Sequence, residues 1–137
     1  ACDALELEIP DAYIREGVYH DPDRCAELTR ELLRLPEPPT CILMPDDFSS
    51  IGGRNAIHRM DLRLPEDISV AGYDGIQIAS VMSPALTTYR QDTQALGRTA
   101  AAKLIELIEK PRTALVDRVL IPGHLVEGAS VRAIETL

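Results

Sequence analysis

Aspartates follow two apolar runs of the chain, and their carboxylates are the side chains best placed to do chemistry. Asp46 and Asp47 come after the run at 40–44, and Asp74 comes after the run at 68–72. Short uninterrupted apolar runs are typical of buried parallel strands. The carboxyl ends of parallel strands lie at one edge of a sheet, where ligands of open α/β sheets bind. We therefore expect these aspartates to converge at one edge.

A carboxylate at such an edge favours reversible binding. Its two oxygens can accept paired hydrogen bonds from adjacent hydroxyls of a sugar or ribose, or from amine donors. The alternative is structural, because an aspartate after a strand often caps the helix or turn that follows. Both interpretations stay open for Asp47, which precedes Phe48 and Ser49, whereas a ligand contact is favoured for Asp74.

Catalytic uses of the same residues fit the sequence less well. Clustered acids can hold magnesium in a phosphoryl-transfer site, but such a site also needs a lysine on a later strand. The lysines are Lys103 and Lys110, on the flank and at the end of a predicted helix. The serines lack a Gly-x-Ser-x-Gly motif and the histidines lack metal-ligand spacing. We expect no catalytic residue, metal site or cofactor, and keep a small magnesium-dependent α/β enzyme using Asp46, Asp47 and Asp74 as an alternative.

The pattern of apolar residues predicts an α/β fold that would position these aspartates. Helices are predicted at 21–35, 49–62 and 92–108, strands at 40–44, 68–72 and 118–121, and the end of a further helix at 1–9. The first of these ranges begins with Asp21 and Pro22, a capping carboxylate followed by a proline in the first turn. Strands that alternate with helices through short connections predict a parallel sheet with helices on both faces.

Composition limits the classes of function. With 137 residues, of which 45% are hydrophobic, the chain can form one domain with a substantial core. Its net charge of −8 would repel a phosphate backbone, so we expect no direct contact of this segment with nucleic acid. No apolar run approaches the roughly 20 residues that cross a bilayer, and the N-terminus has no leader pattern. Cys2, Cys25 and Cys41 lack Cys-x-x-Cys spacing, so we expect reduced thiols in a cytoplasmic protein.

Several longer motifs occur in a fixed order. They are Asp46-Asp47 with Gly52, the run LPEDISVAGYD at 64–74, and PALTT at 84–88 with Gln91. Together they resemble the lactose/galactose repressor (LacI/GalR) family of bacterial transcriptional regulators. The resemblance covers about residues 14–130 and implies the C-terminal subdomain of a periplasmic-binding-protein-like I fold. We therefore expect residues 1–137 to form part of an effector-binding domain, with the helix-turn-helix outside it.

The resemblance implies a set of ligand contacts. Asp74 matches the acid that binds the effector, Asp46 matches an asparagine that contacts it from the neighbouring strand, and Gln91 matches a polar contact in the crossover between subdomains. Thr93 falls where the family can place an aromatic wall, and His20 falls where it often has an aromatic that stacks on the ligand. The acidic residue at position 46 leaves room for an amine-bearing or nucleoside-like effector besides a sugar.

The resemblance also implies an assembly. Residues 92–110 resemble a helix of the N-terminal subdomain, so the apolar face between Leu96 and Ile108 should dock on a second copy, swap or be mobile. The family forms homodimers through the helix after the paired acids and the segment before the Thr-Thr motif. The corresponding residues here are Ser50, Ile51, Arg54, Val81 and Met82.

The function expected from the residues and the resemblance is effector binding and dimerisation in a LacI-type, DNA-binding transcriptional regulator, without catalysis. Binding between two subdomains would shift their closure and thereby the affinity for operator DNA. The alternatives are a periplasmic sugar-binding protein of the same fold and the magnesium-dependent enzyme.

Overall fold

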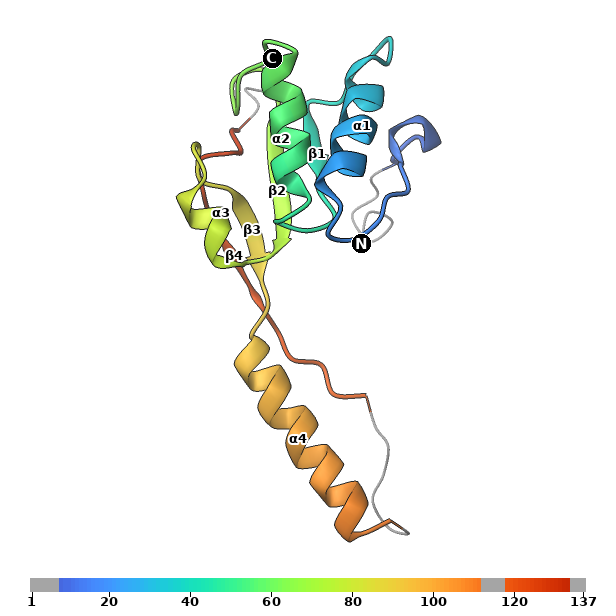
Figure 1. The fold of residues 1–137 in the computed structure, drawn as a ribbon, viewed down its shortest axis with the longest axis vertical. Helices are drawn as coiled ribbons and strands as arrows, with labels where there is room; N and C mark the ends of the chain where they lie inside the picture. The colour runs from blue at the N-terminus through green and yellow to red at the C-terminus, as the bar shows by residue number, and fades with distance from the viewer. Residues whose placement is uncertain (1–7, 112–117, 134–137) are drawn as a thin grey trace.

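A mostly parallel sheet forms the centre of the computed structural model, which describes residues 8–111 and 118–133 (Figure 1). Its strands are β1 (Cys41–Leu43), β2 (Ser69–Asp74), β3 (Thr87–Arg90) and β4 (His124–Val126), and they lie in that order. The first three run parallel, whereas β4 runs antiparallel to β3. The expected α/β fold with a parallel sheet is confirmed.

Helices precede and follow the parallel strands. They are α1 (Pro22–Leu33), α2 (Ser50–Arg59), α3 (Gln77–Val81) and α4 (Thr93–Glu109), and a short 3-10 helix, η2 (Asp11–Tyr13), precedes them. Of these, α2 and α3 connect the parallel strands. α1 begins as the sequence predicts, because the side chain of Asp21 accepts a hydrogen bond from the backbone N–H of Arg24 at 2.9 Å. α2 ends at Arg59, earlier than expected, and Asp61 beyond it leaves the helical region with a φ of 57°.

The hydrophobic core lies against one face of the sheet. Alternate residues of a strand point to opposite faces, and Ile42 and Val70 are buried in one cluster with side chains of α1, α2 and α3. On the opposite face, Leu43, Tyr73 and Leu125 are 75%, 42% and 59% exposed. In the described part of the chain, α1, α2 and α3 therefore cover one face, where the sequence predicts helices on both.

The C-terminal part of the sheet differs from its sequence-based prediction. The strand predicted at 118–121 is wrong: the last strand, β4, pairs with β3 and begins at His124. The apolar run at 118–121 suggests a strand. In the structure, pairing with β3 starts only after Gly123, whose N–H donates to the hydroxyl of Tyr89 at 2.9 Å. β3 and the short α3 were not predicted, since four- and five-residue elements carry little periodic signal.

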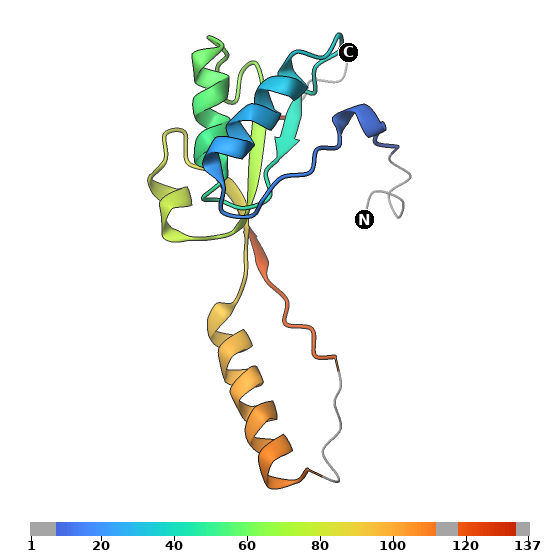
Figure 2. The ribbon, with the colours of Figure 1, turned by 45° about the vertical axis from the view of Figure 1, so that its right-hand side comes forward.

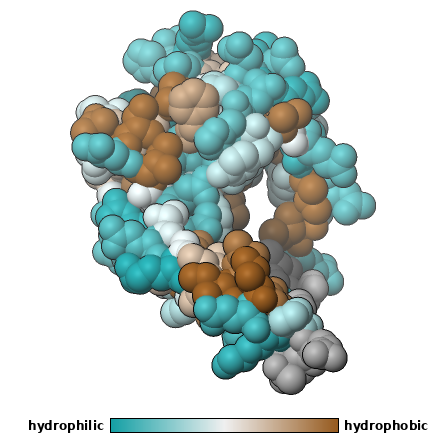
Figure 3. All heavy atoms as spheres, turned by 60° about the horizontal axis from the view of Figure 1, so that its bottom comes forward, coloured by the Kyte–Doolittle hydropathy of each residue, from teal (hydrophilic) through white to brown (hydrophobic). Residues whose placement is uncertain are grey.

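α4 extends away from the sheet, as Figures 1 and 2 show. None of its residues is buried, and Leu104, Ile105 and Ile108 are 59%, 55% and 69% exposed. Figure 3 shows hydrophobic surface gathered at this end of the molecule. Exposed apolar surfaces of this kind often mark contact regions. The docking of α4 on another part of the protein or on a second copy stays a prediction. Most of the helix end predicted at 1–9 lies outside the described residues.

The described helices also bear on membrane association. In residues 8–111 and 118–133, no helix combines the length and the apolar character needed to span a bilayer.

Cys25 is buried and Cys41 is exposed, and both are free cysteines.

Asp47 fastens the carboxyl ends of the strands to one another. Its fully buried side chain accepts hydrogen bonds from the hydroxyl of Thr88 on β3 at 2.6 Å and from the N–H of Ile76 at 2.9 Å. Its own N–H donates to the carbonyl of Tyr73 on β2 at 2.9 Å. The structural interpretation of Asp47 is therefore the one that its contacts support.

Replacement of Asp47 by alanine is expected to lower the free energy of unfolding by about 2–4 kcal/mol, because the buried hydroxyl of Thr88 and the partly buried N–H of Ile76 lose their acceptor. Urea unfolding followed by circular dichroism measures this loss. The control is Asp23→Ala, which removes an exposed aspartate from the first turn of α1 and should cost less than about 1 kcal/mol. Equal stabilities of the two variants would contradict the role given to Asp47.

Candidate functional site

Asp74 stands at the carboxyl end of β2 and is the centre of a polar cluster. The amide Nε2 of Gln91 donates to its Oδ1 at 2.6 Å, and the hydroxyl of Tyr19 donates to its Oδ2. The backbone N–H of Gln91 also donates to the carbonyl of Asp74 at 3.2 Å. Two of the residues predicted to bind a ligand, Asp74 and Gln91, are thus brought together at the expected edge of the sheet.

The backbone of Asp74 is strained. Its φ is 103°, which lies in the region that residues with a Cβ rarely adopt. Asn and Asp tolerate positive φ better than other side chains, and strained residues of this kind cluster at binding sites. The half-buried Asp74 is therefore a residue whose backbone conformation is compatible with a role in binding.

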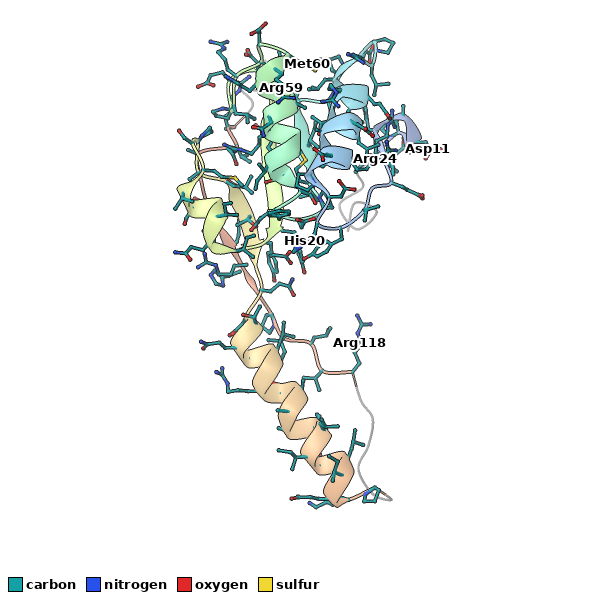
Figure 4. All side chains as sticks on the ribbon, in the orientation of Figure 1. Asp11, His20, Arg24, Arg59, Met60 and Arg118 are labelled. Atoms are coloured by element: carbon teal, nitrogen blue, oxygen red, sulfur yellow. The ribbon has the colours of Figure 1, made fainter. Side chains whose placement is uncertain are left out.

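Aromatic side chains lie beside this cluster. The ring of His20 stacks on that of Tyr19, with centroids 4.4 Å apart, and contacts the ring of Phe48 at 5.4 Å. Figure 4 places His20 at the end of the α/β body that faces α4. Exposed flat rings next to a carboxylate can pack against the apolar face of a sugar or base while the carboxylate accepts its polar hydrogens.

Asp46 is buried and engaged within the protein. Its oxygens accept hydrogen bonds from the N–H and hydroxyl of Ser49, at 2.7 and 2.6 Å, and from the N–H of His20 at 3.1 Å. Burial raises the pKa of the Asp46 carboxyl, but these hydrogen bonds outweigh burial and the pKa is lowered. The carboxylate is therefore charged. Its bonds to Ser49 hold the turn that follows β1, which is the structural role left open for aspartates at strand ends, and its bond to the N–H of His20 connects this turn to residue 20.

Thr93 lies outside the cluster formed by Asp74, Gln91 and Tyr19. It is exposed at the first position of α4, and its backbone N–H donates to the carbonyl of Gln91 at 3.0 Å. The structure therefore places Thr93 next to the cluster along the chain, on the element that leaves the sheet.

The residues predicted at a dimer interface differ in exposure. Val81 is 74% exposed, and Ile51 and Met82 are half-buried. Ser50 is fully buried and Arg54 is 9% exposed. Contact with a second copy could thus involve Val81, Ile51 and Met82 directly, whereas Ser50 and Arg54 lie behind that surface.

Tyr19 and Phe48 belong to the site but were not predicted from the sequence. Tyr19 reaches Asp74 across 55 positions of the chain, which no local pattern reveals. One signal in the sequence could have identified them. Aromatic residues make up only 4% of the chain, and Tyr19 and Phe48 stand directly beside the candidate residues His20 and Asp47.

Chemically, the cluster is suited to hydrogen bonding. It offers a carboxylate, an amide and a phenol within reach of one another, and none of these is activated as a nucleophile by a neighbouring base. Over the ranges that the structure covers, no group of three or more His, Cys, Asp or Glu side chains is arranged to hold a metal ion.

Family and sequence comparisons relate the chain to transcriptional regulators. The family described as a periplasmic binding protein-like domain matches residues 1–131. The probable HTH-type transcriptional repressor ExuR of Bacillus subtilis (strain 168) is 33% identical over 130 residues, which is 95% of this chain and 38% of the relative. The chain therefore spans well under half the length of this relative.

Solved structures show the same similarity. A transcriptional regulator CelR–cellobiose complex matches with a TM-score of 0.84 at 27% identity, covering 94% of this chain and 39% of that one. The lac repressor dimer bound to operator and the anti-inducer ONPF also matches with a TM-score of 0.84, at 30% identity, covering 96% of this chain and 44% of that one.

The bond between Tyr19 and Asp74 predicts an unusual titration. Donation to the carboxylate, together with the negative charges nearby, raises the pKa of Tyr19 from 10.0 to about 12. In Asp74→Asn the pKa should fall back toward 10.0, because the phenolate no longer faces a carboxylate. Carbon-13 NMR of the tyrosine Cζ resonances, with Tyr19→Phe used for assignment, measures this shift.

The corresponding stabilisation has a defined pH window. Because the pKa of Tyr19 is higher in the folded state, its contribution is complete below pH 10.0 and is lost as the pH rises toward about 12. A Tyr19 pKa that is the same in the wild type and in Asp74→Asn would contradict the pairing.

Proposed function

Because this chain belongs to the periplasmic binding protein-like domain family, we propose that it is the effector-binding and dimerising part of a LacI-type transcriptional regulator. The relatives are transcriptional repressors and the matched structures are transcriptional regulators, which agrees with the LacI/GalR resemblance of the sequence. A non-catalytic function and a cytoplasmic location follow from this proposal.

The cluster of Asp74, Gln91 and Tyr19 is the observation that carries the proposal. Asp74 ends β2, and its two oxygens already accept hydrogen bonds from an amide and a phenol. Adjacent hydroxyls of a sugar or ribose can supply the same pair of donors, so an effector would replace protein donors with its own. The cellobiose complex of a related regulator supports a sugar as the class of effector.

The remaining predicted contacts take graded roles in this proposal. His20 stacks on the effector with Tyr19 and Phe48, and Thr93 faces it from the start of α4. Asp46 acts as a positioning residue, since its buried carboxylate holds the backbone of His20 at 3.1 Å.

Gln91 and α4 supply the route from effector to DNA. Gln91 lies between β3 and α4, and α4 carries an apolar face with no buried residue. We propose that α4 docks in the N-terminal subdomain and that the effector, held between the two subdomains, shifts their closure. An effector can shift this equilibrium only by binding the two arrangements with different affinity.

The magnesium-dependent alternative is less well supported. Asp46 and Asp47 are buried, and their oxygens already accept hydrogen bonds from Ser49, His20, Thr88 and Ile76. Metal binding would leave these donors, of which those of Ser49 and Thr88 are buried, without acceptors. A periplasmic sugar-binding protein of the same fold fits the relatives less well, because they are transcriptional repressors and regulators.

A thermal-shift screen of sugars and nucleosides on the intact protein, followed by calorimetric titration of the ligand found, tests the site. Asp74→Asn keeps a side chain that tolerates positive φ, so the fold should persist. Its affinity should fall about 10- to 100-fold, because a charged hydrogen-bond acceptor is lost.

The matched control is Asp61→Asn, since Asp61 is an exposed aspartate that also has a positive φ, of 57°. It lies in the turn after α2, and we expect wild-type affinity. Unchanged affinity in Asp74→Asn, or an equal loss in both variants, would contradict the assignment of Asp74.

The dimer proposal rests on the exposed apolar residues of α3 and α2. Val81→Asp places a charge at the centre of the proposed interface and should weaken dimerisation of the intact protein at least about tenfold. Sedimentation equilibrium measures it, with Val131→Asp, another exposed valine, as the control. Equal dissociation constants for the wild type and Val81→Asp would place the interface elsewhere.

A further inference from the structure

Arg54, in the middle of α2, has hydrogen-bonding capacity that the described protein does not use. The residue is 9% exposed, and its Nη2 donates to the carbonyl of Pro84 at 2.9 Å. Its Nη1 is buried, and no acceptor among the described residues lies within hydrogen-bonding distance of it. A buried cationic nitrogen without an acceptor is costly, so native structures rarely leave one unless a further group binds there.

A cavity of about 530 Å³ adjoins this guanidinium. Arg54 and Pro84, the donor and acceptor of the 2.9 Å bond, both line it, so the guanidinium stands in the cavity wall. Side chains around it that can also donate hydrogen bonds are those of Asn55, His58, Arg63 and Ser83. A volume of this size lies within the range of small-molecule sites.

The charges facing the cavity point to an anionic occupant. Glu66 also lines the cavity and opposes an anion, while Arg63 is held by Asp67 at 2.8 Å and contributes little net charge. Arg54 has no ion-pair partner among the described residues. Burial lowers its pKa, but a guanidinium stays protonated at neutral pH. Its charge is therefore the one left without compensation at this wall.

We propose that this cavity binds a small organic oxyanion, a carboxylate or phosphate, with the guanidinium of Arg54 as its principal anchor. Guanidinium groups present paired N–H donors that match the geometry of carboxylate and phosphate oxygens. The site is distinct from the effector site: residues 62–66 of its lining precede the amino end of β2, whereas Asp74 stands at the carboxyl end. Asp74 accepts hydrogen bonds, whereas this cavity donates them.

The depth of Arg54 favours a free anion over an acidic side chain of a second copy. Arg54 is 9% exposed, whereas Val81 of the proposed dimer surface is 74% exposed. A carboxylate borne on the surface of another subunit would have to enter the cavity, whereas a small molecule can diffuse into it.

Calorimetric titration of the intact protein with inorganic phosphate, malonate and citrate, each at constant ionic strength, tests the proposal. We expect saturable binding of at least one of these probes. Arg54→Met should weaken binding about 10- to 100-fold, the loss of a charge-assisted hydrogen bond. Comparison of the titration with phosphate and the titrations with malonate and citrate shows which of the two kinds of oxyanion binds.

Matched variants separate the site from general effects. Arg59→Met removes an exposed arginine from the end of the same helix (Figure 4) and should bind the probes like the wild type. Asp74→Asn should also bind them like the wild type, so failure of the effector proposal leaves this result unaffected. If Arg54→Met does not fold, Asn55→Tyr narrows the cavity from an exposed position and should weaken binding of the same probes.

Three results would overturn the proposal. One is the absence of saturable binding of any probe to the folded wild type. Another is equal affinity in wild type, Arg54→Met and Asn55→Tyr. The third is a dimer of Arg54→Met that is weaker than the wild-type dimer in sedimentation, by an amount that does not change when a probe is added. Arg54 would then contact a second copy of the chain.

Discussion

The buried carboxylate of Asp47 holds together the edge of the sheet on which the site depends. It joins the end of β1 to Thr88 on β3 and to the N–H of Ile76, at 2.6 and 2.9 Å. Gly72 packs so closely against it that a Cβ there would lie 2.4 Å from Asp47 Oδ1. Because β1, β2 and β3 are fixed to one another at this point, the turn that carries Asp74 leaves the sheet in a defined direction.

Asp46, Asp47 and Asp74 therefore have different roles at this edge of the sheet. Asp47 connects strands through Thr88 and Ile76, whereas Asp46 binds Ser49 and the N–H of His20. Asp74 is half-buried, with donors from side chains that lie near the surface. A carboxylate whose partners are buried is structural, whereas one whose partners can be exchanged for those of a ligand is suited to reversible binding.

The sequence predicted what depends on local pattern. The first strands, α1 with its Asp21 cap, and the placement of Asp74 at the edge of the sheet follow from apolar runs, capping residues and strand polarity, whereas Gln91 was expected at the site only through the LacI/GalR resemblance. The pairing of β4 was missed because it depends on a partner strand distant in the chain. Tyr19 was missed for the same reason, and the buried hydrogen bonds of Asp46 could not be distinguished from ligand contacts without knowing which way its side chain turns.

A complete account of binding requires the part of the protein toward which α4 and the Asp74 cluster face. Because the apolar side chains of α4 are exposed in the described chain, we propose that the site is one wall of a pocket whose other wall belongs to the N-terminal subdomain. Residues on both sides of the crossover at Gln91 would then contact the effector. Such contacts are required if binding of a ligand is to change the closure of two subdomains.

Binding of the effector by Asp74 is best tested by a crystal structure of the intact protein with its effector. We expect an effector hydroxyl or amine within hydrogen-bonding distance of the Asp74 carboxylate, with an aromatic ring of the Tyr19–His20 pair against the ligand and α4 packed in the second subdomain. An effector bound away from Asp74, with Tyr19 and Gln91 still donating to that carboxylate, would show that the assignment of Asp74 is wrong.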